Sequence, residues 1–176
     1  MEDTYVKVIY DELYIADAIY KLSSKLKKVI EFDINKPPVY ICIMDGAVQF
    51  FADVTKELPP GRCAYVKASS YKNNQQAGDL TVCEIPDDLD ANQIFIFDDI
   101  CDSGATLKTI RDLISSKYLN ADVYTAAFIN RTCNKKGVPD FSAITTSESV
   151  FFAGYGMDDK GIGRNIPFIY DCTEGK

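Results

Sequence analysis

The pattern of apolar and polar residues divides the chain into alternating strand-like and helix-like segments. The apolar runs 39–44 and 94–97 are typical of buried strands, and 122–130 is largely apolar. Helical spacing over 11–30 and again after residue 104 predicts helices that cover a sheet, with lysines on a solvated face. Weaker patterns predict further strands at 5–10, 62–68, 80–85, 149–155 and 166–170. This order predicts a mostly parallel α/β sheet with a site at the carboxyl ends of its strands.

One stretch joins a buried strand to a helix through acidic and small polar residues. The run 94–97 is followed directly by Asp98 and Asp99, and then by a turn that contains Ser103 and Thr106. Backbone N–H groups at the helix start, with the two hydroxyls, can bind a phosphate. The paired acids can accept hydrogen bonds from sugar hydroxyls or help to hold a hydrated metal. On spacing alone, an ordinary acidic strand end with a plain helix start is an equally good interpretation.

Composition narrows the classes of protein that the chain can belong to. A net charge of −7 without a basic tract argues against a nucleic-acid surface. No apolar run reaches membrane-spanning length and the first residues are acidic, so we expect a cytoplasmic protein with no membrane partner. Six scattered cysteines predict buried free thiols, and the absence of histidine excludes a histidine-based triad or zinc site.

The stretch from Ile94 to Leu107 resembles the phosphoribosyl-pyrophosphate (PRPP) signature of type I phosphoribosyltransferases. That signature has four apolar residues, two acids, two further residues and then Asp-[Ser/Thr]-Gly-x-Thr. Other segments narrow the resemblance to the hypoxanthine-guanine branch. It implies the type I phosphoribosyltransferase fold, an α/β domain over 1–176 with a mostly parallel central sheet flanked by helices. It further implies a flexible hairpin lid at about 69–80 and a small base-binding hood largely within 130–176.

The resemblance also implies an activity. The enzyme transfers a 5-phosphoribosyl group from PRPP to a purine base, hypoxanthine or guanine, giving a nucleoside 5′-monophosphate and pyrophosphate in purine salvage. Mg²⁺ is the implied cofactor, and a homodimer or homotetramer is the implied assembly. Asp98 and Asp99 hold the ribose hydroxyls and help to hold Mg²⁺, while Asp102 acts as general base. The 5′-phosphate is bound by Ser103, Gly104, Ala105 and Thr106.

Two further loops are implied to act on PRPP. Asp45 and Gly46 correspond to the pyrophosphate loop, and Arg164 binds pyrophosphate as well. Ser70 and Tyr71 belong to the lid that closes over PRPP and excludes water. By composition alone, the lid segment can also be a disordered hairpin tip. The family usually has Lys or Arg before the glycine, so Asp45 either points away, works through Mg²⁺ or contributes nothing.

The last part of the chain resembles the base-binding end of the family. Phe151 corresponds to the ring that stacks on the purine, the backbone of Phe152 reads its edge, and Asp158 lies near Mg²⁺ and the base. Core packing of the two phenylalanines and an ordinary loop acid are the alternatives. Asn130 stands where the family has a lysine that donates to the purine 6-oxo group. Because an amide both donates and accepts, we expect a relaxed preference in which adenine or an unusual base is possible.

Two rival functions stay open at this point. One is a non-catalytic regulator of the same fold that binds PRPP or a nucleotide. The other is a phosphoribosyltransferase for another base, such as adenine. The departures at Asp45 and Asn130 are the reason to keep both rivals.

Overall fold

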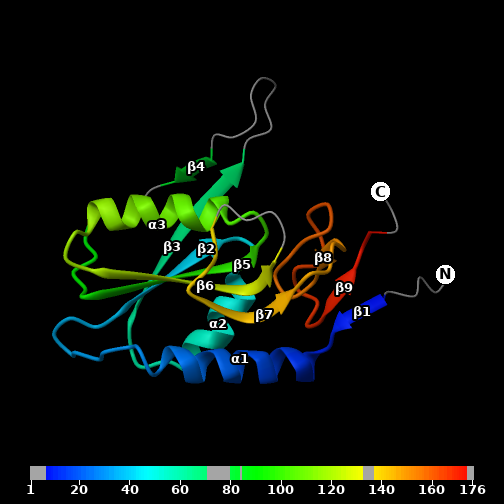
Figure 1. Ribbon diagram of the computed structural model, residues 1–176, viewed down its shortest axis with the longest axis horizontal. Coiled ribbons are helices and arrows are strands. Elements are labelled where there is room, and N and C mark those ends of the chain that lie inside the picture. Colours follow the sequence, from blue (N-terminus) through cyan, green and yellow to red (C-terminus); the bar gives the residue numbers. More distant parts are fainter. Residues whose placement is uncertain (1–6, 71–79, 84, 133–136, 174–176) are drawn as a thin grey trace.

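The computed structural model describes residues 7–70, 80–83, 85–132 and 137–173, with strands and helices alternating along most of the chain (Figure 1). In order, the elements are β1 (Lys7–Tyr10), α1 (Glu12–Leu26), β2 (Val39–Met44), α2 (Val48–Lys56), β3 (Arg62–Ser70), β4 (Leu80–Cys83), β5 (Gln93–Cys101), α3 (Ala105–Lys117), β6 (Asp122–Arg131), β7 (Phe141–Thr146), β8 (Phe152–Ala153) and β9 (Ile169–Asp171).

A six-stranded sheet forms the centre of the molecule, in the order β4-β3-β2-β5-β6-β7. Its neighbouring strands are parallel except at β4, which pairs antiparallel with β3. This confirms the predicted mostly parallel α/β sheet. A second, three-stranded sheet in the order β1-β9-β8 lies beyond one end of the main sheet (Figure 1).

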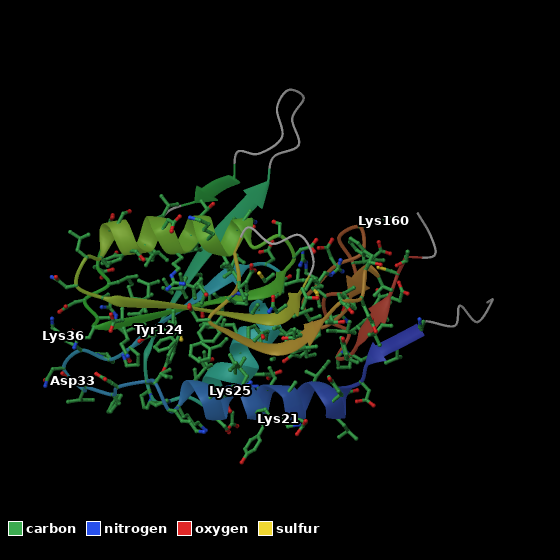
Figure 2. The ribbon with its side chains drawn as sticks, in the orientation of Figure 1. Lys21, Lys25, Asp33, Lys36, Tyr124 and Lys160 are labelled. Carbon is green, nitrogen blue, oxygen red and sulfur yellow. The ribbon has the colours of Figure 1, made fainter. Side chains whose placement is uncertain are left out.

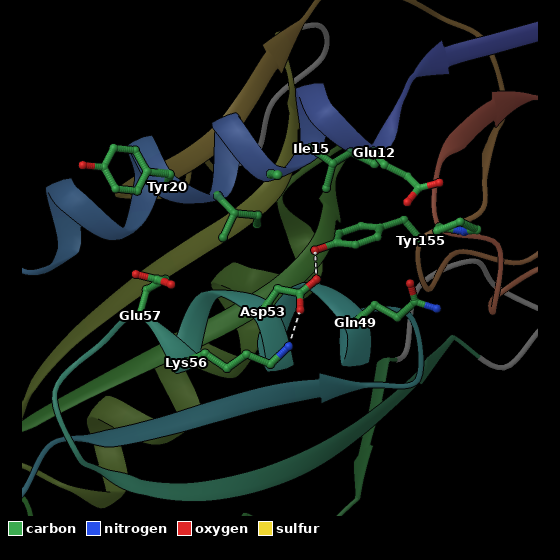
Figure 3. A pocket seen from close by; sticks show the side chains of 11 residues that line it. Glu12, Ile15, Tyr20, Gln49, Asp53, Lys56, Glu57 and Tyr155 are labelled. Atoms are coloured by element: carbon green, nitrogen blue, oxygen red, sulfur yellow. Dashed lines mark hydrogen bonds and ion pairs between the residues drawn. The ribbon is translucent and has the colours of Figure 1, made fainter.

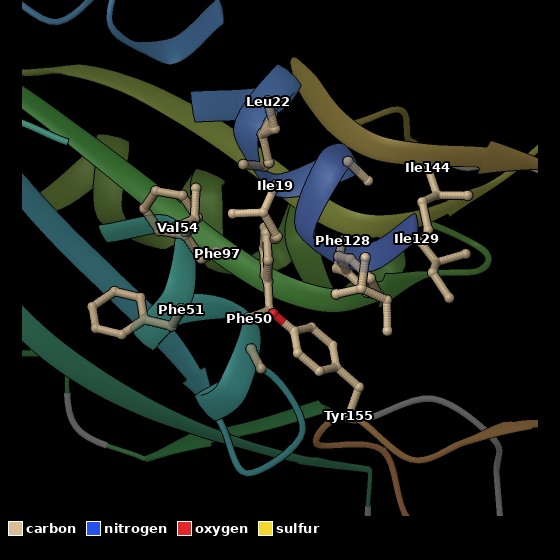
Figure 4. Packing of buried hydrophobic residues seen from close by; sticks show 14 of the residues in the cluster. Ile19, Leu22, Phe50, Phe51, Val54, Phe97, Phe128, Ile129, Ile144 and Tyr155 are labelled. Atoms are coloured by element: carbon tan, nitrogen blue, oxygen red, sulfur yellow. The ribbon is translucent and has the colours of Figure 1, made fainter. Parts of the chain in front are cut away.

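Both faces of the main sheet are covered, which explains the continuous apolar runs 39–44 in β2 and 94–97 in β5. Helices α1 and α2 cover one face and α3 covers the other (Figure 1). On the α1–α2 side, the ring of Phe97 contacts the rings of Tyr40, Phe50 and Phe51 (Figure 4). The next residues along β2, such as Ile41, face α3 instead, because adjacent strand residues point to opposite faces.

Helix α1 begins one residue after Asp11, whose carboxylate accepts a hydrogen bond from the Tyr14 backbone N–H at 2.8 Å. The helix ends at Leu26, four residues before the predicted end. Its lysines are exposed as predicted, and Lys21 and Lys25 lie on its outer side (Figure 2). Leu13 is 82% exposed although it is apolar, because the buried stripe of α1 runs through Ile15, Ala18, Ile19, Leu22 and Leu26.

Several predicted boundaries were wrong. Strand β5 continues to Cys101, so Asp98 and Asp99 lie inside the strand and not after it. Strand β7 was missed, because half of the residues of this edge strand are polar and Ile144 is its one buried hydrophobic residue. The strand predicted at 149–155 shrinks to Phe152–Ala153, since glycines with positive φ follow it at 154 and 156.

Two further expectations can be compared with the structure. Cys42 is a buried free thiol as expected and Cys101 is also buried, whereas Cys63 is exposed on β3. Among the helices that the structure describes, none combines the length and the apolar character needed to cross a membrane.

The aromatic contacts around Phe97 predict a large cost for removing its ring. Phe97→Ala should lower the free energy of unfolding by about 3–5 kcal/mol, since the ring is fully buried and leaves a cavity. Urea denaturation followed by circular dichroism measures this loss. Leu13→Ala is the control and should change stability by less than about 0.5 kcal/mol. Equal losses in the two variants would contradict the assigned core.

Candidate functional site

Two neighbouring cavities lie where β2 and β5 end. The larger has a volume of about 300 Å³, and the smaller, of about 70 Å³, lies along the turn that leads into α3. Asp98, Ile100 and Thr106 line both cavities. The larger is lined in addition by Ile43, Met44, Gly46, Ala68, Asp99, Asp158 and Arg164. The smaller is lined in addition by Cys101, Asp102, Ser103, Gly104, Ala105 and Leu107.

The structure therefore brings most of the predicted site residues together. The larger cavity is lined by Gly46, Asp98, Asp99, Thr106, Asp158 and Arg164. The turn 102–105 lines the smaller cavity next to it. Asp45, Asn130, Phe151 and Phe152 are not among the residues that line either cavity. The side chain of Ser70 and the whole of Tyr71, both predicted for the lid, lie outside the described residues.

The acid pair is the most unusual electrostatic feature of the site. The Asp98 side chain is in the interior, with the residue only 6% exposed, and its Oδ1 accepts a hydrogen bond from the Asp99 N–H at 3.1 Å. Burial, and then repulsion from Asp99, raise the pKa of Asp98 well above its ordinary value. Burial also raises the pKa of Asp99, although hydrogen bonds with Asp98 and the Ile100 N–H, and lastly the charge of Arg164, oppose this. The pair is therefore costly to ionise without a ligand that supplies donors or positive charge.

The turn before α3 has the geometry of an anion site. Gly104 adopts φ +78°, and a Cβ there would lie 2.2 Å from the Gly137 carbonyl oxygen, so no larger residue fits. The first turn of α3 carries no acidic residue. Its free N–H groups and the positive end of the helix dipole can therefore face a phosphate. Ser103 Oγ lies 3.3 Å from the Ala105 N–H, beside the same helix start.

The loop after β2 approaches the acid pair closely. A Cβ on Gly46 would lie 1.8 Å from Asp99 Oδ2, which explains the glycine. The Met44–Asp45 peptide bond just before it is cis. Asp45 Oδ2 lies 3.6 Å from Lys67 Nζ on β3, and both side chains are largely exposed. The carboxylate at 45 is thus paired with a cation that sequence reasoning missed, although such exposed pairs contribute little to stability.

The opposite wall of the larger cavity carries a positive charge. Arg164 Nη2 lies 2.5 Å from Asp158 Oδ1, and Arg164 Nη1 donates to the Gly156 carbonyl at 2.7 Å. Asp158 Oδ2 also accepts the Gly161 N–H at 2.8 Å. The guanidinium is therefore held in place on two sides while it lines the cavity. This arrangement can present Arg164 to an anionic ligand.

The end of β6 contains a residue that sequence reasoning did not select. Arg131 Nη1 lies 3.9 Å from Asp102 Oδ1, and its guanidinium lies over the Phe152 ring at 4.9 Å. The sequence feature that could have indicated Arg131 is its position directly after Asn130, at the end of a buried strand. Phe152 is only 4% exposed and packs in the core, whereas Phe151 is 41% exposed. Of the two rings, Phe151 is thus the accessible one. Asn130 is buried beside this group.

Mg²⁺ fits this site only if a ligand supplies part of its coordination. Among the described residues, no three Asp, Glu, Cys or His side chains gather closely enough to hold a metal ion. Mg²⁺ is often bound by one or two carboxylates together with substrate phosphates. Asp98 and Asp99, which line the same cavity, have the donor chemistry for such a shared ion.

Comparison with known proteins points to one family. Residues 7–160 match the family model described as phosphoribosyl transferase domain. The hypoxanthine-guanine-xanthine phosphoribosyltransferase of Tritrichomonas foetus is 28% identical, over 96% of this chain and 92% of the relative. The hypoxanthine-guanine phosphoribosyltransferase of Aquifex aeolicus is 27% identical, over 94% of this chain and 93% of the relative.

Solved structures agree on the fold. A hypoxanthine phosphoribosyltransferase of Staphylococcus aureus superimposes with a TM-score of 0.78 at 23% identity, covering 94% of this chain and 90% of that one. The Trypanosoma cruzi hypoxanthine phosphoribosyltransferase in complex with its product IMP gives a TM-score of 0.79 at 19% identity, covering 97% of this chain and 96% of that one. The expected type I phosphoribosyltransferase fold is thereby confirmed.

The buried acid pair predicts that the folded protein becomes less stable as pH rises. Because the folded-state pKa of Asp98 is raised, the folded protein loses stability as pH rises from about 4, the unfolded value, through that raised pKa. Asp98→Asn removes this loss. Its melting temperature should match that of the wild type near pH 4 and exceed it by about 2–4 °C at pH 7–8, the shift that about 1 kcal/mol produces.

Thermal unfolding by circular dichroism across this pH range measures the effect. Asp87→Asn is the matched control, since Lys117 lowers the pKa of the exposed Asp87. The control should show no gain that grows with pH. A constant or shrinking difference between Asp98→Asn and the wild type would rule out the proposed cost of ionisation.

Proposed function

The chain belongs to the phosphoribosyl transferase family, and we propose that it transfers a 5-phosphoribosyl group from PRPP to a purine base of the hypoxanthine-guanine type. The products are a nucleoside 5′-monophosphate and pyrophosphate, as in purine salvage. The observation that carries this proposal is the convergence of Asp98, Asp99, Thr106 and Arg164 on one cavity. The names of the two curated relatives, which extend over nearly the whole chain, support the same reaction.

The parts of the cavity suit the parts of PRPP. The 5′-phosphate binds at the N-terminus of α3, over residues 103–106. Asp98 and Asp99 accept hydrogen bonds from the ribose hydroxyls, which repays part of the cost of burying them. The backbone at Gly46 and the guanidinium of Arg164 face the pyrophosphate. Asp98 and Asp99 would hold Mg²⁺ together with the substrate, and the ion would neutralise part of the charge of the leaving pyrophosphate.

The chemistry is a substitution at C1 of the ribose. The bond from C1 to pyrophosphate breaks, a bond from C1 to a purine nitrogen forms, and the ribose carries positive charge in between. Asp98 and Asp99 lie on the side where that charge develops and stabilise it. Asp102, at the turn below the base, accepts a proton from the purine. Arg131, whose Nη1 lies 3.9 Å from Asp102, orients that carboxylate.

Base preference depends on the end of β6. Asn130 pairs in register with Cys101 of β5 and Thr145 of β7, so its position in the sheet is fixed. An amide at this place can donate to a 6-oxo group or accept from a 6-amino group. We therefore propose that 6-oxopurines are favoured less strictly than they are with a lysine there. Adenine is the alternative substrate that this residue admits.

A panel of bases tests the function directly. Purified protein with PRPP and Mg²⁺ should release pyrophosphate when hypoxanthine or guanine is added. A non-catalytic regulator binds PRPP but releases no pyrophosphate with hypoxanthine, guanine, xanthine or adenine. That outcome would reject the proposed activity and favour the regulator. Mg²⁺ dependence and assembly into a homo-oligomer stay predictions of the resemblance.

Asp102→Asn should reduce turnover by about 10²- to 10⁴-fold, because the amide cannot accept the purine proton. PRPP binding by isothermal titration calorimetry should change by less than about threefold, since the phosphate and ribose contacts remain. Asp112→Asn, on the exposed side of α3, is the control and should keep wild-type turnover. Unchanged turnover in Asp102→Asn would remove this residue from the mechanism.

Asn130→Lys should sharpen base choice. A lysine donates but cannot accept, so kcat/KM for hypoxanthine relative to adenine should rise by about ten- to a hundredfold. The ratio is measured with both bases at fixed PRPP, and the melting temperature of the variant checks that the buried lysine is tolerated. A wild type that already excludes adenine would show that Asn130 does not relax the preference.

A further inference from the structure

A set of contacts outside the substrate cavity holds the loop that carries Asp158 and Arg164. This loop starts with the turn 154–156, in which Gly154 has φ +90°, Tyr155 +47° and Gly156 +97°. A left-handed conformation is unusual for a bulky residue such as tyrosine and needs support from its surroundings. The turn also touches the pyrophosphate loop, since a Cβ on Gly156 would lie 2.0 Å from the Gly46 carbonyl oxygen.

Helix α2 supplies the support for Tyr155. The ring is only 5% exposed and lies 4.9 Å from the ring of Phe128, between centroids. Its hydroxyl donates to Asp53 Oδ2 at 2.7 Å, and the other oxygen of Asp53 accepts from Lys56 at 2.7 Å (Figure 3). Burial, and then the hydrogen bond to Asp53, raise the pKa of Tyr155, so the hydroxyl stays protonated and keeps donating.

The backbone next to Tyr155 holds Arg164. The Gly156 N–H donates to the Arg164 carbonyl at 2.9 Å, and Arg164 Nη1 donates back to the Gly156 carbonyl at 2.7 Å. Gln49, one turn before Asp53 on α2, donates its side-chain amide to the same Arg164 carbonyl. A shift of the turn at Tyr155 would therefore move both the backbone carbonyl and the guanidinium of Arg164.

Asp53 and Tyr155 act from outside the substrate cavity. They line a separate cavity of about 440 Å³ between α1 and α2, together with Gln49 and Lys56 (Figure 3). Arg164 and Asp158 line the 300 Å³ cavity on the other side of the turn. Any effect of Asp53 or Tyr155 on a ligand of that cavity is therefore indirect, and the loop that carries Arg164 connects the two cavities.

We propose that Tyr155 and Asp53 are positioning residues for Arg164. Their hydrogen bond fixes the left-handed turn to α2, and the turn aims the guanidinium at the pyrophosphate of PRPP. The inference rests on the proposed function for the identity of this ligand. It adds two residues that touch neither the ribose nor the base but set the affinity for the phosphoribosyl donor.

The test removes the hydroxyl and keeps the ring. Tyr155→Phe should raise the dissociation constant and the KM for PRPP by roughly five- to tenfold, the effect of about one hydrogen bond, with kcat and the KM for the base within about twofold. Asp53→Ala should raise the dissociation constant and the KM for PRPP by the same factor as Tyr155→Phe. Asp53→Asn keeps an acceptor oxygen, so both values should stay near those of the wild type. Lys56→Ala is the control, because it leaves the Tyr155–Asp53 bond in place.

A double-variant cycle separates positioning from a general structural role. In an Arg164→Ala background, Tyr155→Phe should change the KM for PRPP by less than about twofold, because its effect passes through the missing guanidinium. A full effect in that background, or unchanged PRPP affinity in Tyr155→Phe and Asp53→Ala, would overturn the inference alone. A wild type that fails to bind PRPP would instead overturn the proposed function.

Discussion

The candidate site depends on two neighbouring carboxylates, Asp98 and Asp99, placed near the end of a central strand. Asp98 and Asp99 follow directly on the part of β5 that pairs with β2 and lie beside β6, where burial raises the pKa of both. A folding argument alone gives no reason for such a pair, because its ionisation costs stability. A ligand with hydroxyl donors and positive charge does give one. The rest of the site is arranged around that pair: Gly46 packs on it, the start of α3 lies beside it, and Arg164 faces it.

Two residues depart from the pattern of the hypoxanthine-guanine branch, and their surroundings differ. Asp45 is exposed and its carboxylate lies near Lys67, so the loop keeps its backbone against Asp99 without a cation at position 45. Asn130 is buried in the sheet between Cys101 of β5 and Thr145 of β7. The first change leaves the shape of the pyrophosphate loop intact. In the proposed function, the second alters the donors and acceptors next to the base, and therefore bears on specificity more than on catalysis.

Local pattern predicted the mostly parallel sheet and the motif at its centre, but not every strand. The apolar run 39–44 matched β2 at both ends, and the signature from Ile94 to Thr106 placed the acid pair and the phosphate turn correctly in one region. Strand β7 was not predicted, because an edge strand needs few apolar residues. The contact between Tyr155 and Asp53 was not predicted, because the two residues are 102 positions apart and a left-handed tyrosine has no sequence signal. Arg131 was visible in the sequence, but its proximity to Asp102 depends on how β6 lies beside β5.

A crystal structure of the protein with Mg²⁺ and PRPP, or with a stable PRPP analogue, tests the central claim most directly. The account predicts a 5′-phosphate within hydrogen-bond distance of the backbone N–H groups of residues 103–106, with the ribose hydroxyls against Asp98 and Asp99. A donor bound elsewhere, or a ribose turned away from the two carboxylates, would contradict it.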